Sequence, residues 1–143
     1  MPTTTYASPK PAWIITGPTS GIGRRTALEL AGRGTVVLVG RDPKKLKEVE
    51  AEINAQAGGH AVSVVCDFSD IPSVRSAAAQ IVTLGLPLAG LLNNAGIMPN
   101  RAEKTPQGWD LAFTTKKHAL TAAGCRKIFA DKKSGKNCAL WLI

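Results

Sequence analysis

Short apolar runs alternate with amphipathic segments along the first two thirds of the chain. The runs are rich in Val, Ile and Leu, which is typical of buried strands, and they cover residues 12–16, 35–39, 61–66 and 88–92. Apolar residues at helical spacing predict helices that begin near Gly21, Pro43 and Ile71. This alternation predicts the α/β class: a doubly wound parallel sheet with Rossmann-like topology, covered on both faces.

Single residues sharpen this prediction. Asp42 before Pro43 predicts an N-cap followed by proline at the first helical position. Gly34 is expected to take a left-handed conformation at the end of the first helix. His60 is predicted to be a surface residue at a strand start, and Cys66 an inert buried thiol.

Composition restricts the class of protein. The 143 residues are 44% hydrophobic and 20% charged, which is typical of one soluble globular domain. No apolar run reaches the about 20 residues of a membrane helix, and the first ten residues lack the pattern of a secretory signal. The three cysteines have no close pairing, which argues against a disulfide framework or a zinc site. We therefore expect a cytoplasmic protein with no metal.

Charge is distributed unevenly along the chain. The formal net charge is +8, and residues 116–143 hold seven lysines and arginines against one acid, Asp131. A basic segment can bind nucleic acid or anionic lipid, form a solvated surface, or lie outside the fold. Because no aromatic residues are interleaved with the basic ones in a stripe, nucleic-acid binding is the least favoured of these readings.

A glycine-rich turn carries the strongest chemical signal. The first strand runs directly into Gly17-Pro18-Thr19-Ser20-Gly21-Ile22-Gly23, which opens the first helix. A phosphate can approach backbone N–H groups at a helix N-terminus, and glycines leave room for that approach. A glycine turn alone is a weak signal, but between a strand and a helix it predicts a dinucleotide site.

This turn resembles that of the short-chain dehydrogenases/reductases in its spacing Gly17-x-x-x-Gly21-x-Gly23. The resemblance continues with Arg41 after the second strand, Asp67 after the third and Asn93-Asn94-Ala95-Gly96 after the fourth, and it covers residues 12–115. It implies that a dinucleotide cofactor is bound by Gly17, Thr19, Ser20, Gly21, Ile22, Gly23, Arg41, Asp67, Phe68, Asn93, Asn94, Ala95 and Gly96.

The residue after the second strand selects the cofactor. An acid there binds the ribose 2′-OH of NAD, but this chain has Arg41, whose planar fork suits a phosphate. We therefore predict NADP. By resemblance, Asp67 accepts a hydrogen bond from the adenine amino group and Phe68 offers its backbone N–H. Asp67 and residues 93–96 are also residue types that form simple turns. Arg24 and Arg25 either add to the positive field of the site or form a solvated face.

The catalytic part of the family is not recognisable. Carbonyl reduction needs a proton donor, which the family supplies as Tyr-x-x-x-Lys on a helix, after a strand that carries a serine. The one tyrosine here, Tyr6, lies before the first strand, and Pro9 makes a helix between it and Lys10 unfavourable. Lys116 stands where the family has an asparagine of its proton relay. No catalytic residue is therefore predicted.

These observations predict an NADP-binding oxidoreductase of this family, which transfers hydride between NADP(H) and a carbonyl or alcohol substrate but is inactive as written. The alternatives are a non-catalytic NADP-binding or regulatory module and, behind it, a nucleic-acid-binding protein. The substrate is not predicted. A small substrate is expected only if a further half is supplied, and neither a membrane nor nucleic acid is an expected partner.

The expected organisation is an N-terminal extension (1–11), a dinucleotide-binding domain (12–115) and an atypical basic segment (116–143), with a fifth strand near 138–143 and the fold truncated there. Because motif, periodicity and charge all change near Lys116, we hypothesise that the last segment arose from a reading-frame slip, an altered splice or a mis-called gene. Without further elements, one sheet edge and Leu91 and Leu92 are expected to lack cover, which favours self-association.

Overall fold

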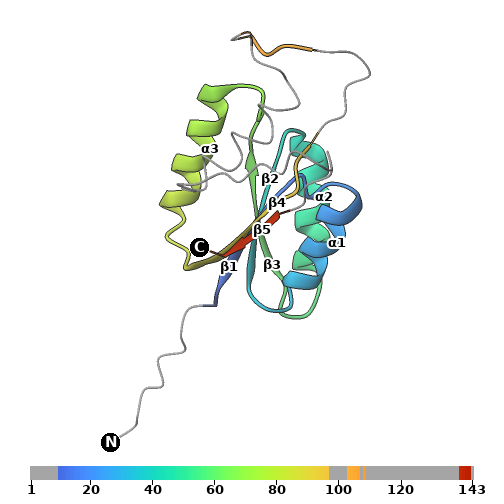
Figure 1. Cartoon of the computed structure of the whole chain (residues 1–143). Helices are drawn as coiled ribbons and strands as arrows, with labels where there is room; N and C mark the ends of the chain where they lie inside the picture. Colours follow the sequence, from blue (N-terminus) through green and yellow to red (C-terminus); the bar gives the residue numbers. More distant parts are fainter. Residues whose placement is uncertain (1–9, 97–102, 107, 109–138, 143) are drawn as a thin grey trace, which may run out of the picture.

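Strands and helices alternate as the hydrophobic pattern predicts (Figure 1). The computed structural model describes residues 10–96, 103–106, 108 and 139–142. The elements are β1 (Ala12–Thr16), α1 (Gly21–Leu30), β2 (Thr35–Gly40), α2 (Pro43–Asn54), β3 (His60–Val65), α3 (Ile71–Thr83), β4 (Leu88–Asn93) and β5 (Ala139–Leu142). Tyr6 and Lys116, on which the missing catalytic part was argued, lie outside the described residues.

The strands form one sheet in the order β3-β2-β1-β4-β5. The first four strands are parallel, which confirms the predicted doubly wound α/β class. β5 instead pairs with β4 in the antiparallel sense, with Ala139 opposite Asn93. The direction of this strand was not predicted, and the predicted parallel sheet holds for the four strands on which the prediction was based. An antiparallel partner enters at the carboxyl end of β4, whereas a parallel one would need a crossover to its other end.

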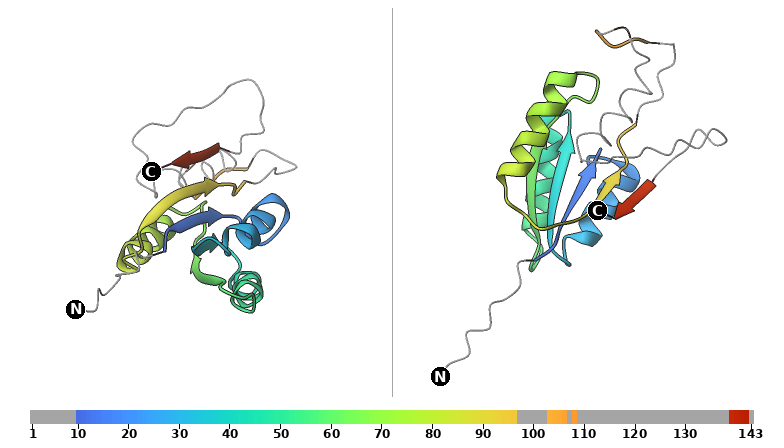
Figure 2. Two further views of the ribbon diagram at one scale, coloured as in Figure 1. Left: turned by 90° about the horizontal axis from the view of Figure 1, so that it is seen from below. Right: turned by 60° about the vertical axis from the view of Figure 1, so that its left-hand side comes forward.

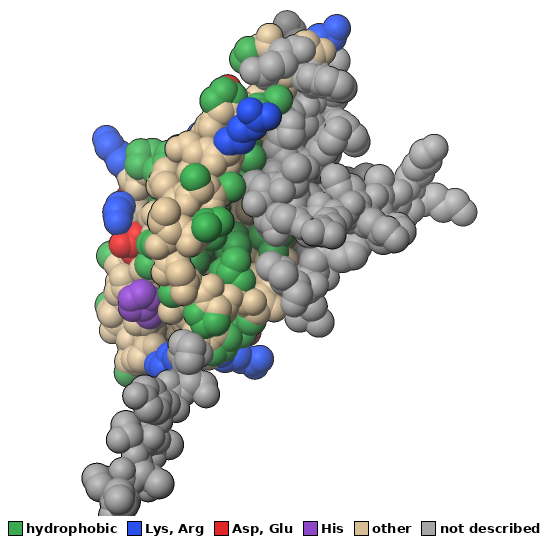
Figure 3. Space-filling view, turned by 90° about the vertical axis from the view of Figure 1, so that its left-hand side faces the viewer, with side chains coloured by type: hydrophobic (Ala, Val, Ile, Leu, Met, Phe, Trp, Pro, Cys, Tyr) green, Lys and Arg blue, Asp and Glu red, His purple; other side chains and the backbone are tan. Residues whose placement is uncertain are grey.

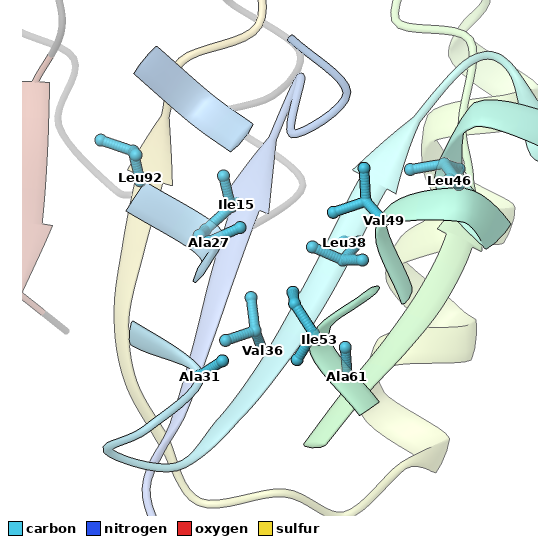
Figure 4. Close-up of a cluster of buried hydrophobic side chains, with 10 residues drawn as sticks. All are labelled: Ile15, Ala27, Ala31, Val36, Leu38, Leu46, Val49, Ile53, Ala61 and Leu92. Atoms are coloured by element: carbon cyan, nitrogen blue, oxygen red, sulfur yellow. The ribbon is translucent and has the colours of Figure 1, made fainter. Parts of the chain in front are cut away.

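Helix α3 lies on one face of the sheet and helices α1 and α2 lie on the other (Figure 2). A hydrophobic cluster lies between each face and its helices. Figure 4 shows the cluster under α1 and α2, in which Leu46 and Ile53 of α2 meet Leu38 of β2. On the other face, Val74 and Ala77 of α3 pack against Val37 and its neighbours. Successive residues of each strand point to opposite faces, so strands covered on both sides are apolar throughout.

Aspartates begin the second and third helices. Asp42 Oδ1 accepts hydrogen bonds from the backbone N–H groups of Lys44 (2.9 Å) and Lys45 (3.3 Å), which confirms the predicted N-cap. Asp70 Oδ2 accepts one from Ser73 N (3.1 Å) and begins α3 in the same way. Both carboxylates satisfy N–H groups that have no partner inside the helix.

Gly34 has a different reason to be glycine from the one predicted. Its φ is not positive, and α1 ends instead at Leu30 with Ala31 in a right-handed conformation. A Cβ at Gly34 would lie under 3.0 Å from the carbonyl oxygen of Pro11, the acceptor for Thr35 N (3.0 Å). The close approach of the β1 entry to the β2 entry therefore requires glycine here.

The face that carries α3 gathers hydrophobic side chains, with charged ones mostly at its margins (Figure 3). Val82, near the end of α3, is 78% exposed. Leu91 and Leu92, which were expected to lack cover, are buried at 1% and 8% exposure. That prediction was wrong, because the two leucines point to opposite faces and each joins one of the two clusters.

Candidate functional site

A cavity of about 630 Å³ lies where the parallel strands end. Its lining residues come from the glycine-rich turn and from the segments that follow β2, β3 and β4: Gly17, Thr19, Ser20, Gly21, Ile22, Gly40, Arg41, Asp67, Phe68, Ser69, Asn94, Ala95 and Gly96. The structure thus brings together all the predicted site residues except Gly23 and Asn93. It adds Gly40 and Ser69, which the sequence reasoning missed.

The start of α1 forms one wall of this cavity. Gly17 and Gly21 have φ of +66° and +53°, the left-handed region that glycine adopts without strain. The side chain of the N-cap residue Ser20 makes no capping hydrogen bond to α1, and α1 has no acid in its first turn. The first N–H groups of α1 therefore lack both an intrahelical partner and a side-chain cap, unlike those of α2 and α3. This end of α1 attracts an anion.

Gly23 is buried and acts through its missing side chain. A Cβ at this position would lie under 3.0 Å from both Asn94 Nδ2 and the carbonyl oxygen of Gly17. Asn94 Nδ2 donates to the carbonyl oxygens of Thr16 (3.2 Å) and Gly17 (3.0 Å). Gly23 thus leaves the room in which Asn94 holds the glycine turn against the end of β4.

Thr16 adds a second connection between the same segments. Its buried hydroxyl accepts a hydrogen bond from Ala95 N (2.9 Å) and lies 3.4 Å from Asn93 Oδ1. Asn93 is 7% exposed, which explains why it lies behind the cavity wall. The sequence showed Thr16 only as the last residue of a strand, so this role could not be foreseen from its position.

Arg41 supplies positive charge at the end of β2. It is exposed and lines the cavity, and it makes no ion pair with any residue in the described ranges. Asp42 points its carboxylate into the first turn of α2 as a cap. Arg24 and Arg25, for which a positive field was one alternative, pair instead with Glu52 and Glu29 and do not line the cavity.

Asp67 supplies negative charge at the end of β3. Its Oδ1 accepts hydrogen bonds from Ser69 N (2.9 Å) and Ser69 Oγ (2.6 Å), so the predicted turn is present. The hydrogen bond from the Ser69 hydroxyl is the main cause that lowers the pKa of Asp67, against the opposing effect of burial, and the charge of Arg41 adds to the lowering. The Asp67 carboxylate therefore stays ionised to a lower pH than an ordinary aspartate.

Cys66 and His60 take no part in the cavity wall. Burial, together with the negative charge of Asp67, raises the pKa of the Cys66 thiol to about 11, so the thiol stays protonated and unreactive at neutral pH. His60 is exposed at the start of β3, as predicted. No cluster of three potential metal ligands occurs among the described residues, and none of the helices described there is long and apolar enough to cross a membrane.

Comparison with known proteins identifies relatives over most of the chain. The pattern of the family described as short chain dehydrogenase matches residues 11–136, which include most of the segment expected to be atypical. Mouse polyprenol dehydrogenase is 41% identical over 99 residues, covering 68% of this chain and 30% of that protein. Human retinol dehydrogenase 11 is 38% identical over 111 residues, covering 76% and 35%. The chain thus spans about a third of the length of these relatives.

Solved structures share the fold. A short-chain dehydrogenase from Sphingobium yanoikuyae in complex with NADPH has a TM-score of 0.67 and 27% identity, with 80% of this chain and 45% of that chain covered. A metagenomic short-chain oxidoreductase in complex with NADP has a TM-score of 0.66 and 34% identity, with 80% and 56% covered.

Proposed function

The chain belongs to the short-chain dehydrogenase family, and from this premise we propose that its cavity binds NADP(H) and that Arg41 contacts the 2′-phosphate. One observation carries the proposal: the uncapped start of α1 and the guanidinium of Arg41 line the same cavity. Helix N-termini bind diphosphates through backbone N–H groups, and an arginine fork binds a phosphate through two hydrogen bonds.

The cavity wall fits such a ligand. A Cβ built at Gly21 meets nothing within 4 Å, so the turn is open on the side where a diphosphate would approach. Asp67, whose lowered pKa keeps it an acceptor, is suited to the adenine amino group. The two solved relatives hold NADPH and NADP, which supports the choice of the phosphorylated cofactor.

We further propose that the reaction of the whole protein is hydride transfer between NADP(H) and an alcohol or carbonyl group. The relatives named polyprenol and retinol dehydrogenases act on alcohols by their names, which supports this substrate class. NADPH, when bound, supplies the hydride, and the residues of this chain bind and orient it. Tyr6 is the single tyrosine of the 143 residues, and we propose that it is no proton donor, because it precedes β1.

A fluorescence titration with NADPH and NADH tests the cofactor assignment. We expect the wild type to prefer NADPH, and Arg41→Asp to lose about 10- to 100-fold in NADPH affinity, because a charge-assisted phosphate contact is lost. Arg33→Asp is the matched control, since Arg33 is also exposed but does not line the cavity. Equal binding of both cofactors by the wild type, or an unchanged preference in Arg41→Asp, would contradict the assignment.

Turnover separates the oxidoreductase from its main alternative. A non-catalytic NADP-binding or regulatory module would bind NADPH without consuming it in the presence of a panel of carbonyl compounds. We expect this outcome for the 143-residue chain, because no Tyr-x-x-x-Lys follows β4 in its sequence. Steady consumption of NADPH that Arg41→Asp abolishes would contradict this part of the proposal.

A further inference from the structure

Ser69 lines the cavity, and no role has yet been given to its side chain. Ser69 lines the cavity beside Asp67 and Phe68, and it makes both of the hydrogen bonds received by Asp67 Oδ1. The bond from the Ser69 hydroxyl, at 2.6 Å, has the length expected of a hydroxyl that donates to a carboxylate, which is about 2.5–2.7 Å. The side chain of Ser69 therefore fixes the rotation of the Asp67 carboxylate.

The rest of Asp67 is held as well. Its backbone N–H donates to Ser73 Oγ (2.9 Å), and Ser73 is in turn bound through its own N–H by the Asp70 cap. No described residue donates a hydrogen bond to the second carboxylate oxygen, Oδ2. One oxygen is thus committed to Ser69, and the other remains for a donor in the cavity.

We propose that Ser69 is a positioning residue that makes the site select an adenine ring over a purine without a 6-amino group. It does so by committing Asp67 Oδ1, which leaves Oδ2 as a fixed acceptor in the cavity. The inference rests on the proposed binding of NADP(H), and it adds a determinant of base selectivity to that site.

The chemistry of the carboxylate explains the selectivity. An ionised carboxylate only accepts hydrogen bonds, so the group that meets Oδ2 must be a donor. The 6-amino group of adenine is a donor, whereas the 6-oxo group of hypoxanthine is an acceptor and would be repelled. Without Ser69 the carboxylate can rotate, and its preference for a donor at one fixed point weakens.

The test compares NADPH with reduced nicotinamide hypoxanthine dinucleotide phosphate in fluorescence titrations of the full chain. We expect the wild type to prefer the adenine form, and Ser69→Ala to reduce the ratio of the two affinities by about ten-fold, the effect of one hydrogen bond to a charged group. Ser69→Thr retains the hydroxyl and is expected to retain the ratio. Ser76→Ala, at an exposed position on α3, is the serine control and is expected to change neither affinity.

Asp67→Asn gives a second readout that does not depend on Ser69→Ala being folded. The amide retains an oxygen for Ser69 and presents an NH₂ donor in place of Oδ2, so the preference for adenine should be lost or reversed. The acid limb of NADPH binding gives a third readout. Ser69→Ala should move it to higher pH, because the variant lacks the hydroxyl that lowers the pKa of Asp67. The variant leaves Arg41, Cys66 and Asp70, the charged or titratable groups near Asp67, in place.

The outcomes separate the inference from the proposed function. If Ser69→Ala weakens both ligands equally, Ser69 only stabilises the turn and the inference is overturned, while NADP(H) binding stands. If the wild type binds NADPH and the hypoxanthine dinucleotide equally well, the inference is also overturned and NADP(H) binding again stands. If the wild type binds neither ligand, the proposed function fails and the inference fails with it.

Discussion

Gly23→Ala is predicted to disrupt the site, although Gly23 is buried and does not line the cavity. A methyl group there would lie under 3.0 Å from Asn94 Nδ2 and from the carbonyl oxygen of Gly17. Asn94 can rotate away, but it then loses its hydrogen bonds to the carbonyl oxygens of Thr16 and Gly17. The Gly17 oxygen belongs to the backbone, so the glycine turn itself must also shift.

The two effects set the size of the loss. Two hydrogen bonds contribute about 1 kcal/mol each, and overpacking of a well-packed site costs about 1–3 kcal/mol. We therefore expect Gly23→Ala to lower the free energy of unfolding by about 3–5 kcal/mol, a large part of the about 5–15 kcal/mol that a domain of this size has. The distortion of Gly17 should also abolish NADPH binding.

Urea unfolding followed by circular dichroism measures the loss of stability. Gly32→Ala is the matched control, because a Cβ at Gly32 meets nothing within 4 Å and its φ is not positive. The double variant Gly23→Ala/Asn94→Ala no longer has one of the two clashing groups. Its loss of unfolding free energy should therefore be smaller than the sum of the losses of the two single variants. If Gly23→Ala unfolds at the same urea concentration as Gly32→Ala, the close contacts with Asn94 and Gly17 are not what requires glycine at position 23.

Three further predictions follow from single contacts. Asp42→Ala removes the cap of α2 and should lower the free energy of unfolding by about 1 kcal/mol, measured by thermal unfolding against the exposed control Lys44→Ala. Cys66, with its pKa raised to about 11, should resist iodoacetamide at pH 8 in the folded chain and react in urea, as peptide mass spectrometry at this site would show; rapid labelling of the folded chain would contradict its burial. The pKa of Glu50 is lowered overall: burial raises it, but the Ser63 hydroxyl and Lys47 together lower it by more. This stabilisation is present above the unfolded pKa of about 4.3 and is lost as the pH falls through the lower folded value, so Ser63→Ala should cost stability at pH 7 and less near pH 3; a cost that is constant across this range would contradict the linkage.

Much of the fold could be predicted because local and global signals agree. The β-branched runs and the amphipathic segments marked β1–β4 and α1–α3, and Asp42-Pro43 marked the start of α2 to the residue. The same signal, an aspartate shortly before proline, was available at Asp70 and was overlooked. The prediction for Gly34 failed because its reason is a contact with Pro11 in another strand entry, which no local pattern reveals.

The site was predictable where its residues follow strand ends. Parallel strands bring their carboxyl ends to one edge of the sheet, so Arg41, Asp67 and Asn94 were expected to meet. Thr16 and Ser69 were missed, because their roles depend on particular hydrogen bonds. The bond from Ala95 to Thr16 joins residues 79 positions apart, and serine two residues after aspartate is too common to indicate a role by itself.

The hydrogen bonds that Asn94 and Ala95 make to Thr16 and Gly17 also determine when the cavity can exist during synthesis. The glycine motif is translated early, but its shape depends on residues that leave the ribosome almost eighty positions later. A nascent chain must therefore pair β4 with β1 before it can capture any nucleotide. Because a ligand stabilises only the state that binds it, the cofactor can protect chains that have passed this point and none that stalled before it.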